Sequence, residues 1–521
     1  MKRIVSLLLA VLMLFGMVAC GEAAETLTDE SKDQITTIED ETEDPNYVCD
    51  LPSDLDYNEE QIGILYIDFN NKERELISDE LGQGVVSDAV FERNTLVQEQ
   101  LNVVFEYFEK TEVTQVATAQ SLDIQSGQGD YDIVVNGTFL AIQPALEGKY
   151  VELSELENMN TSKHYWSQGF NDMVTFSGIQ YLASGSMAIS MSSFTYVTLY
   201  NRNLFTDYKL PDPYETVTQG KWTLDYQYSL VKDHYVDKDG DSKASTGDFY
   251  GFLTDNIILV DPYMVSCEIP MIVKDPDTGD LTYNTAALQK LSDLCDKVQL
   301  LYNDESTFVY SYSISGYGVD GTNLLLDHFA ADNALMATTM FVEMERKYES
   351  LAPMSYGIAP IPKFDENQQK YRSYVQDQVS SFGISAVVGD EDRREMLAAV
   401  LEAMAYHSHI LVRPAYYEVT LSSRYMQDPQ SKEILDLIFD SLYFDFSSTC
   451  SNLVPACVIR DHLRPILSGK KIQFLPPLAP GRGPCKGPWT STTNRWLSLC
   501  PDAVYPYVKN APAVHLPAGA F

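Results

Sequence analysis

Basic residues are scarce in this sequence. Its 521 residues include 36 Lys and Arg against 75 Asp and Glu, which gives a formal net charge of −39. An acidic surface is repelled by nucleic-acid phosphates, so the charge excludes nucleic acid as a partner, and it also excludes a basic helix lying on a membrane. Part of the excess is local, because residues 21–60 hold fifteen Asp or Glu and one Lys.

The cysteines lack the spacing of a disulfide framework or a CxxC motif. Once Cys20 is set aside for the reason given below, an odd and scattered set of seven remains among the eight cysteines of the chain. Such a set in a long exported chain predicts no disulfide scaffold, although individual bridges stay open.

Enzyme motifs are weak or missing as well. The chain has no HExxH and no GxSxG, and the GxGxxG match at 316–321 follows a polar stretch that makes a poor strand. Carboxylates are plentiful but nothing selects a catalytic pair. The sequence therefore predicts no enzyme and no required cofactor. Two other classes of protein stay open as alternatives, a surface-anchored glycan-active enzyme and an adhesion lipoprotein.

Long apolar runs are also rare, and the chain has one that matters, Ile4 to Ala19 after Lys2 and Arg3. Sixteen residues at about 1.5 Å each span about 24 Å, which is short for a membrane-crossing helix and typical of a cleaved signal segment. Small residues before Cys20 resemble a bacterial lipobox. We therefore expect a signal peptide at 1–19, lipidation of Cys20, and attachment to the outer face of the cytoplasmic membrane. An ordinary signal peptide is the alternative.

Both ends of the mature chain have unusual compositions. Residues 20–60 are acidic and aperiodic, which predicts a flexible tether. Residues 472–521 hold nine of the 24 prolines and one acidic residue. This atypical tail indicates either a genuine Pro-rich end or, as we favour, a reading-frame shift near 470–471.

Between these ends, β-rich runs alternate with helical patterns. Strands are expected at 62–67, 102–108 and 131–135, and Val86, Val90, Val97 and Leu101 share one helix face between the first two. This order predicts an α/β fold with a mainly parallel sheet. Ligands of such sheets bind beyond the carboxyl ends of the strands, here near Asp68, Phe69 and Asn136.

Several segments resemble the extracellular solute-binding proteins of bacterial ABC importers, particularly the large sugar-binding lipoproteins of Gram-positive bacteria. The segments that carry the resemblance are VELSEL at 151–156, GIQY at 178–181, LYNRNLF at 199–205, PDPY at 211–214, GKWTLD at 220–225, YGIAPIPK at 356–363 and PAYYE at 414–418. Together they span roughly residues 61–470.

The resemblance implies a two-lobed, periplasmic-binding-protein-like fold with hinge segments and an interlobe cleft. It implies a first lobe at 61–182 and 340–412, and a second lobe at 186–336 and 416–470. Hinges are then expected near 182–185, 337–339 and 413–415. The implied function is delivery of a small ligand, a carbohydrate, to the permease subunits of an ABC importer by a monomeric, membrane-anchored protein. Peptides and other solutes are bound on similar scaffolds.

Sugar binding requires apolar faces and planar polar groups. The chain has 33 Tyr, 22 Phe and 4 Trp, most of which must serve packing. We therefore restrict the candidates to strand ends and loops near the hinges: Asp68, Phe69, Asn136, Trp222, Tyr263, Asp377 and Tyr416. For Trp222 the alternative is that it holds the helix beginning beside it.

The loop at 237–248 has the ligand spacing of a calcium site. The expected ligands are Asp237, Asp239, Asp241, the main-chain carbonyl of Lys243, and Asp248. Ser242 replaces the usual Gly and Asp248 replaces the usual Glu, so a solvated acidic turn is the alternative. A calcium ion here would be structural.

Overall fold

The computed structural model describes residues 47–67, 75–275, 281–310, 320–417, 429–451, 453 and 463–464. The expected signal peptide, Cys20 and the tail at 472–521 lie outside this range. The elements named below belong to residues 49–521, one of two compact units of the chain. Among the described residues, no helix combines the length and the apolar character needed to cross a membrane.

The first lobe is built on a four-stranded sheet in the order β14-β3-β1-β2. Strand β1 is parallel to β2 and β3, and β14 is antiparallel to β3. The three strands expected from the sequence are therefore confirmed. Its elements are β1 (Glu60–Ile67), α4 (Val85–Leu101), β2 (Val103–Lys110), α5 (Val113–Ser126), β3 (Ile133–Gly137), α6 (Thr138–Leu146), α7 (Gln168–Val174), β4 (Thr175–Phe176), β5 (Ile179–Gln180), β14 (Ser380–Ile384), α17 (Glu391–His407) and η2 (Ser408–Val412).

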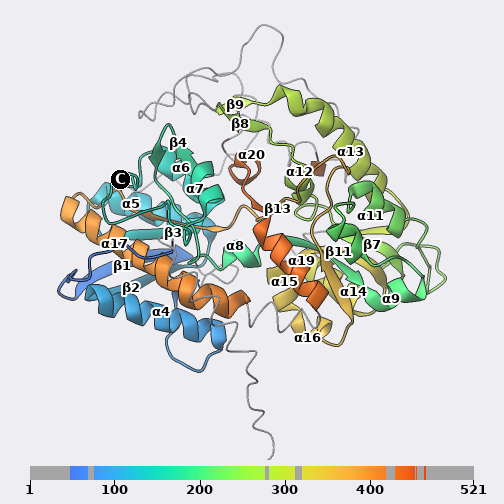
Figure 1. Ribbon diagram of the computed structural model, residues 1–521, viewed down its shortest axis with the longest axis horizontal. Helices are drawn as coiled ribbons and strands as arrows, with labels where there is room; N and C mark the ends of the chain where they lie inside the picture. The colour runs from blue at the N-terminus through green and yellow to red at the C-terminus, as the bar shows by residue number, and fades with distance from the viewer. Residues whose placement is uncertain are drawn as a thin grey trace, which may run out of the picture. The chain divides into compact units, whose positions relative to one another are not determined.

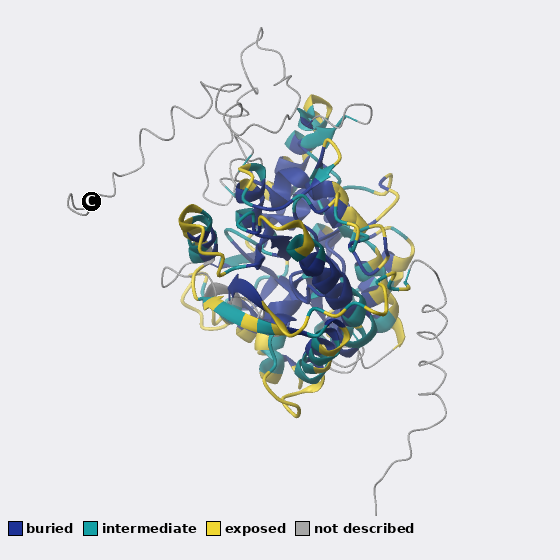
Figure 2. Cartoon of the chain, turned by 90° about the vertical axis from the view of Figure 1, so that its left-hand side faces the viewer, coloured by how far each residue is buried: buried dark blue, intermediate teal, exposed yellow. Residues whose placement is uncertain are grey.

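Helices cover both faces of this sheet, because alternate side chains of each strand point to opposite faces. Ile64 of β1 lies in a core with Val97 of α4 and Leu401 of α17. Its neighbour Leu65 lies in another core with Val116 of α5. Figure 2 shows these buried segments inside a shell of intermediate and exposed residues.

The second lobe is built on a five-stranded sheet in the order β10-β7-β11-β6-β12, of which Figure 1 labels β7 and β11. Strands β10, β7 and β11 are parallel, and β6 runs antiparallel between β11 and β12. Its elements are β6 (Tyr196–Asn201), α9 (Arg202–Asp207), α10 (Pro213–Thr218), α11 (Leu224–Val231), β7 (Tyr250–Asp255), α12 (Pro262–Ser266), β8 (Ile272–Lys274), β9 (Leu281–Tyr283), η1 (Thr285–Ala287), α13 (Leu288–Tyr302), β10 (Thr307–Tyr310), α14 (Asp320–Ala330), β11 (Ala334–Met340), α15 (Phe341–Arg346), α16 (Tyr348–Leu351), β12 (Tyr356–Ala359) and α19 (Pro429–Asp440).

Two connecting segments join the lobes and lie side by side. The first, 186–195, contains α8 (Ser190–Ser193), and the second, 360–379, contains β13 (Ser373–Tyr374). Thr195 and Val375 form a β-bridge, and the main-chain N–H of Gln376 donates to Phe194 O at 3.0 Å. The third passage follows η2, which packs on α4, and leads to α19, which packs on β12. It includes the hinge expected at 413–415.

The structure corrects the lobe boundary expected at residue 340. Ala337, Thr338 and Thr339 lie inside β11 and pair with β6, so they form part of a sheet and not a hinge. Strand β12 also belongs to the second sheet. The antiparallel strand β6 pairs with β11 on one side and with β12 on the other. The chain returns to the first lobe only after β12. The second lobe therefore extends through Ala359.

The expected tether also ends earlier than residue 60. Leu51, Leu55 and Tyr57 pack against the core of the first lobe, and Asp50 forms an ion pair with Lys163 at 2.6 Å. These three side chains bury apolar surface against the lobe, whereas the more acidic sequence before them has few apolar side chains to bury.

A C-terminal segment, residues 442–451, contacts both lobes. It contains β15 (Leu442–Tyr443), which pairs with β13, and α20 (Phe446–Thr449). The Phe446 ring lies edge-on to Phe176 of β4, with centroids 5.6 Å apart. On the other side, Ser447 Oγ accepts the N–H of Met271 at 3.2 Å.

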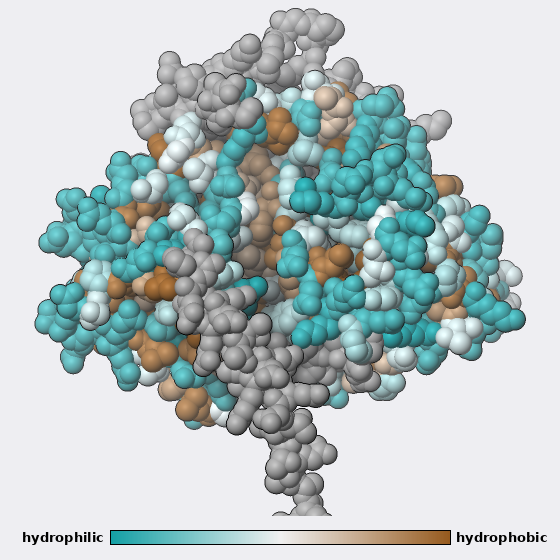
Figure 3. Space-filling view, viewed as in Figure 1, coloured by the Kyte–Doolittle hydropathy of each residue, from teal (hydrophilic) through white to brown (hydrophobic). Residues whose placement is uncertain are grey.

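The face in Figure 3 is mainly hydrophilic, with apolar side chains gathered in its middle.

Candidate functional site

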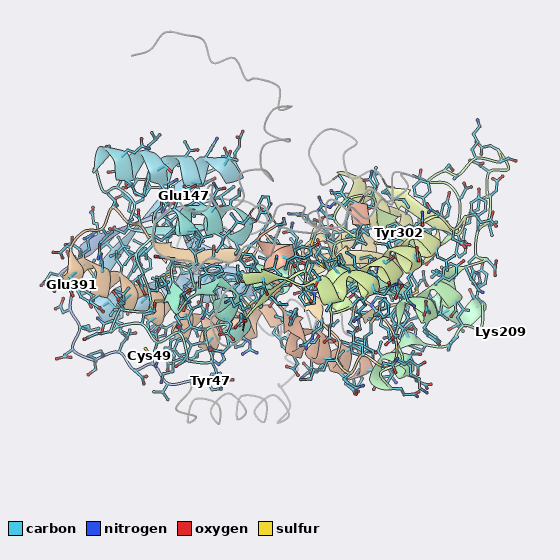
Figure 4. All side chains as sticks on the ribbon, turned by 90° about the horizontal axis from the view of Figure 1, so that it is seen from above. Tyr47, Cys49, Glu147, Lys209, Tyr302 and Glu391 are labelled. Atoms are coloured by element: carbon cyan, nitrogen blue, oxygen red, sulfur yellow. The ribbon has the colours of Figure 1, made fainter. Side chains whose placement is uncertain are left out.

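The carboxyl edge of the second sheet carries a group of polar side chains. Strand β7 ends at Asp255, and the antiparallel strand β6 begins at Tyr196, opposite the last residue of β11. Both residues therefore lie at the edge where open α/β sheets bind ligands. Thr254, next to Asp255, hydrogen-bonds at 2.9 Å with Tyr302, which Figure 4 labels.

We call Tyr196, Asp255, Asp261, Tyr374, Asp377 and Arg464 the edge cluster. Burial raises the pKa of Tyr196 well above its usual value, and the charges of Asp261, Asp377 and Asp255 raise it further. The rings of Tyr196 and Tyr374 are parallel, with an interplanar angle of 2° and centroids 5.5 Å apart. The cluster thus joins the sheet edge to the second connecting segment.

Two buried atoms of the cluster have no hydrogen-bond partner among the described residues, the hydroxyl of Tyr196 and Oδ2 of Asp255. Oδ1 of Asp255 accepts the main-chain N–H groups of Ile257 and Leu259, each at 2.9 Å. Burial raises the pKa of Asp255 to about 7, although these two hydrogen bonds oppose the increase. An unpaired buried polar atom is costly, so a group that pairs with it is stabilised.

Asp261 and Arg464 form a partly buried pair within the cluster. Nε of Arg464 donates to Oδ1 of Asp261 at 2.9 Å, and the second guanidinium nitrogen donates to the other carboxylate oxygen. Burial lowers the pKa of Arg464, but the charge of Asp261 outweighs it and the pKa is raised overall. The guanidinium therefore remains charged.

Asp377 connects the cluster to the first lobe. Its main-chain carbonyl accepts the N–H of Phe139 in α6 at 3.0 Å. The charge of Asp377 raises the pKa of Tyr196 and the pKa of Arg464. Nearby, at the end of β3, Asn136 is buried and its Nδ2 has no partner among the described residues. Asn136 thus lies at a strand end and Asp377 in a connecting segment, and their contact with a ligand stays a prediction.

Three other expected ligand contacts stay predictions. Trp222 is fully buried, and its indole N–H donates to Pro360 O at 2.7 Å, so it holds the start of α11 against the second connecting segment. Tyr263 is also fully buried, edge-on to Tyr302. Tyr416 is buried and its hydroxyl donates to Glu345. Asp68 and Phe69 lie outside the described residues.

Sequence reasoning missed Tyr196, Asp255, Asp261 and Arg464. Asp255 follows a buried strand, which is the signal that selected Asp68, so the same rule applied to 250–255 would have found it. Tyr196 begins an antiparallel strand, and Arg464 lies far along the chain in a region without a recognisable period. Neither has a local signal.

The loop expected to bind calcium brings three of its carboxylates together. Ligand oxygens of Asp237, Asp239 and Asp248 lie within 4.8 Å of one another. Asp241 is not in this group, and its Oδ1 accepts the N–H of Lys243 at 2.8 Å. The N–H of Asp241 lowers the pKa of Asp239, but burial and the neighbouring carboxylates outweigh it and raise the pKa. Calcium binding here stays a prediction.

No protein-family model and no curated protein sequence matches the chain. Among solved structures, the chain is similar to a sugar transporter from Rhizobium etli in an open conformation, with TM-score 0.51 and 14% identity over 78% of this chain and 95% of that one. It is also similar to a family 1 extracellular solute-binding protein from Bifidobacterium longum subsp. infantis, with TM-score 0.50 and 13% identity over 79% of this chain and 95% of that one. At these identities the likeness defines the fold, and the chain has the two-lobed α/β fold of these proteins.

Proposed function

We propose that the protein binds a small, hydroxyl-rich ligand, a carbohydrate, and delivers it to an ABC importer without altering it. The observation that carries this proposal is the edge cluster, where buried atoms of Tyr196 and Asp255 lack hydrogen-bond partners within the described part of the chain. The cluster lies at the edge where α/β sheets bind ligands and beside a segment that joins the lobes. The names of the two similar structures, a sugar transporter and an extracellular solute-binding protein, support the same function.

We infer that both lobes contact the ligand at the same time. A ligand that touches the cluster and Asn136 is bound more tightly when the lobes are close, so it shifts the population toward that state. An importer that recognises this state would receive only the loaded protein. The function needs no bond to break, which agrees with the absence of a recognisable catalytic motif in the sequence.

A thermal-shift screen of neutral oligosaccharides and peptides tests the proposal, with chromatography of each sugar after incubation. A carbohydrate should raise the melting temperature and be recovered intact. Release of shorter fragments would support the glycan-active enzyme instead. The adhesion lipoprotein is the remaining explanation if no small molecule changes the melting temperature.

We also propose that a lipid on Cys20 holds the protein at the outer face of the cytoplasmic membrane. The apolar run before Cys20 and the acidic stretch after it support this location. Cys20→Ser should move the protein from the membrane fraction to the medium. Size-exclusion chromatography of that variant tests the expected monomer.

A further inference from the structure

The two atoms of the edge cluster that a ligand would pair with are enclosed in this structure. The hydroxyl of Tyr196 and Oδ2 of Asp255 are both buried, and the Tyr374 ring lies parallel to the Tyr196 ring. A hydrogen bond needs its donor and acceptor about 3 Å apart. A ligand hydroxyl therefore reaches either atom only after a neighbouring element has moved away.

The C-terminal segment, residues 442–451, lies beside the cluster at two places. Its strand β15 pairs with β13, the strand that carries Tyr374. Burial raises the pKa of Tyr196 and of Cys450, and the charge of Asp377 raises both further. Asp377 thus lies between the cluster and the far end of the segment, which makes the segment the neighbouring element whose movement opens the cluster.

Few contacts hold the C-terminal segment in place. Strand β15 has two residues. Two aromatic rings of the segment lie edge-on to rings of the first lobe, and one hydroxyl accepts a main-chain N–H of the second lobe: Phe444 with Phe170, Phe446 with Phe176, and Ser447 with Met271. A segment held by so few contacts opens at a lower free energy than the core strands and helices.

Helix α20 keeps its shape without these contacts. Oδ1 of Asp445 accepts the N–H of Ser448 at 2.9 Å and the hydroxyls of Ser447 and Ser448 at 2.6 and 2.7 Å. All three hydrogen bonds lie inside the C-terminal segment and satisfy the start of the helix. The segment can therefore move as one body.

We propose that the C-terminal segment is a lid, which opens to admit a ligand to the edge cluster and then closes over it. This inference rests on the proposed function, since it describes access to the same site. The shut lid contacts the first lobe through Phe446 and the second through Ser447. Opening the lid therefore also releases a contact between the lobes.

Thiol labelling of the full-length mature protein tests the lid without any ligand. Cys450 of the lid and Cys295 of α13 are both buried, with 0% and 3% of their surface exposed. Because the lid opens while the core stays folded, N-ethylmaleimide should modify Cys450 at least about tenfold faster than Cys295, each rate being divided by its value in urea. Equal normalised rates, measured by peptide mass spectrometry, would overturn the lid.

A disulfide that fixes β15 to β13 tests access to the site. The hydroxyl oxygens of Ser373 and Ser441 lie 2.9 Å apart, so cysteines at these positions can form a disulfide. The oxidised variant Ser373→Cys/Ser441→Cys should associate at least about tenfold more slowly with a carbohydrate that the wild type binds, and a reductant should restore the rate. Wild type treated with the same oxidant is the control. An unchanged association rate in the oxidised variant refutes the lid.

Phe446→Ala is a second variant that keeps the test decisive if the disulfide does not form. It removes the contact with Phe176, so Cys450 should be labelled at least about threefold faster than in the wild type. Phe105→Ala removes an edge-on contact with Tyr107 in β2 and should leave the labelling rate of Cys450 unchanged. Equal effects of the two substitutions would count against the lid. Failure of the wild type to bind any carbohydrate would remove the proposed function, whereas the labelling rates still decide whether the segment opens.

Discussion

Asp255 carries a pH dependence that can be measured directly. Its pKa is raised from 3.8 to about 7, chiefly by burial. Between these values the folded protein binds the proton more tightly than the unfolded chain, so stability is lost as the pH rises from about 4 to about 7. Asp255→Asn removes this loss.

We expect Asp255→Asn to raise the melting temperature relative to the wild type at pH 8 and to have little effect at pH 4. The difference corresponds to at most about 4 kcal/mol. Thermal melts across this pH range provide the measurement. Parallel melting curves for the two proteins at every pH would contradict the assigned cause.

Glu75 is a second buried carboxylate on which stability depends. It accepts hydrogen bonds from Ser380 Oγ at 2.6 Å and from the N–H of Ser190, and so connects the first lobe to the first connecting segment. Burial lowers the pKa of Arg93 to about 10, and the charge of Glu75 counteracts this effect. Glu75→Ala leaves a buried guanidinium with less compensation and should cost about 3 kcal/mol in urea unfolding.

Exposed Glu80 provides the control for that experiment. Its carboxylate accepts a surface hydrogen bond from Gln83 at 2.8 Å. Glu80→Ala should change the free energy of unfolding by less than about 0.5 kcal/mol. Similar losses in the two variants would show that Glu75 has no special role.

At the scale of elements, Lys274 connects strand β8 of the second lobe to helix α7 of the first. Its ammonium donates to the main-chain carbonyls of Asp172 and Thr175 and lies 5.3 Å from the centre of the Phe176 ring. Lys274→Met keeps the apolar stem and removes the donors. We expect a loss of about 2 kcal/mol in the free energy of unfolding.

Lys290 is a matched residue within the second lobe. Its ammonium donates to Glu268 O at 3.5 Å and lies 5.1 Å from the centre of the Phe364 ring. It makes one long hydrogen bond where Lys274 makes two, so Lys290→Met should cost less than about 1 kcal/mol. A larger loss for Lys290→Met than for Lys274→Met would show that the contact between lobes adds little.

The acidic loop at 237–248 gives another expectation at this scale. Calcium should raise the melting temperature by about 3 °C at a concentration near one hundred times its dissociation constant. Asp239→Asn should abolish most of this shift, because Asp239 is one of the three grouped carboxylates. The solvated-turn alternative is supported if calcium and magnesium have the same small effect.

At the scale of the whole molecule, we propose that the two connecting segments and the third passage act as hinges between the lobes. We expect a bound carbohydrate to decrease the radius of gyration in small-angle scattering if it contacts both lobes as proposed. A saturating ligand that leaves the scattering curve unchanged would argue for a rigid binding protein.

Local pattern was sufficient for much of the first lobe. Strand β1 and helix α4 follow from the apolar run at 62–67 and from the spacing of Val90 and Val97, because each element buries one face or stripe of its own sequence. The strand ends that these patterns define also placed Asn136 at an edge of the sheet.

Only the tertiary structure decided which strands share a sheet and which side chains meet. Pairing of β12 with β6 depends on hydrogen bonds between residues about 160 positions apart, and no local period records them. Trp222 lies in a loop that the sequence offered as a ligand contact, and its indole N–H donates to the second connecting segment. The edge cluster joins Tyr196, Asp255 and Arg464 from distant parts of the chain, since burial and charge act through space rather than along the sequence.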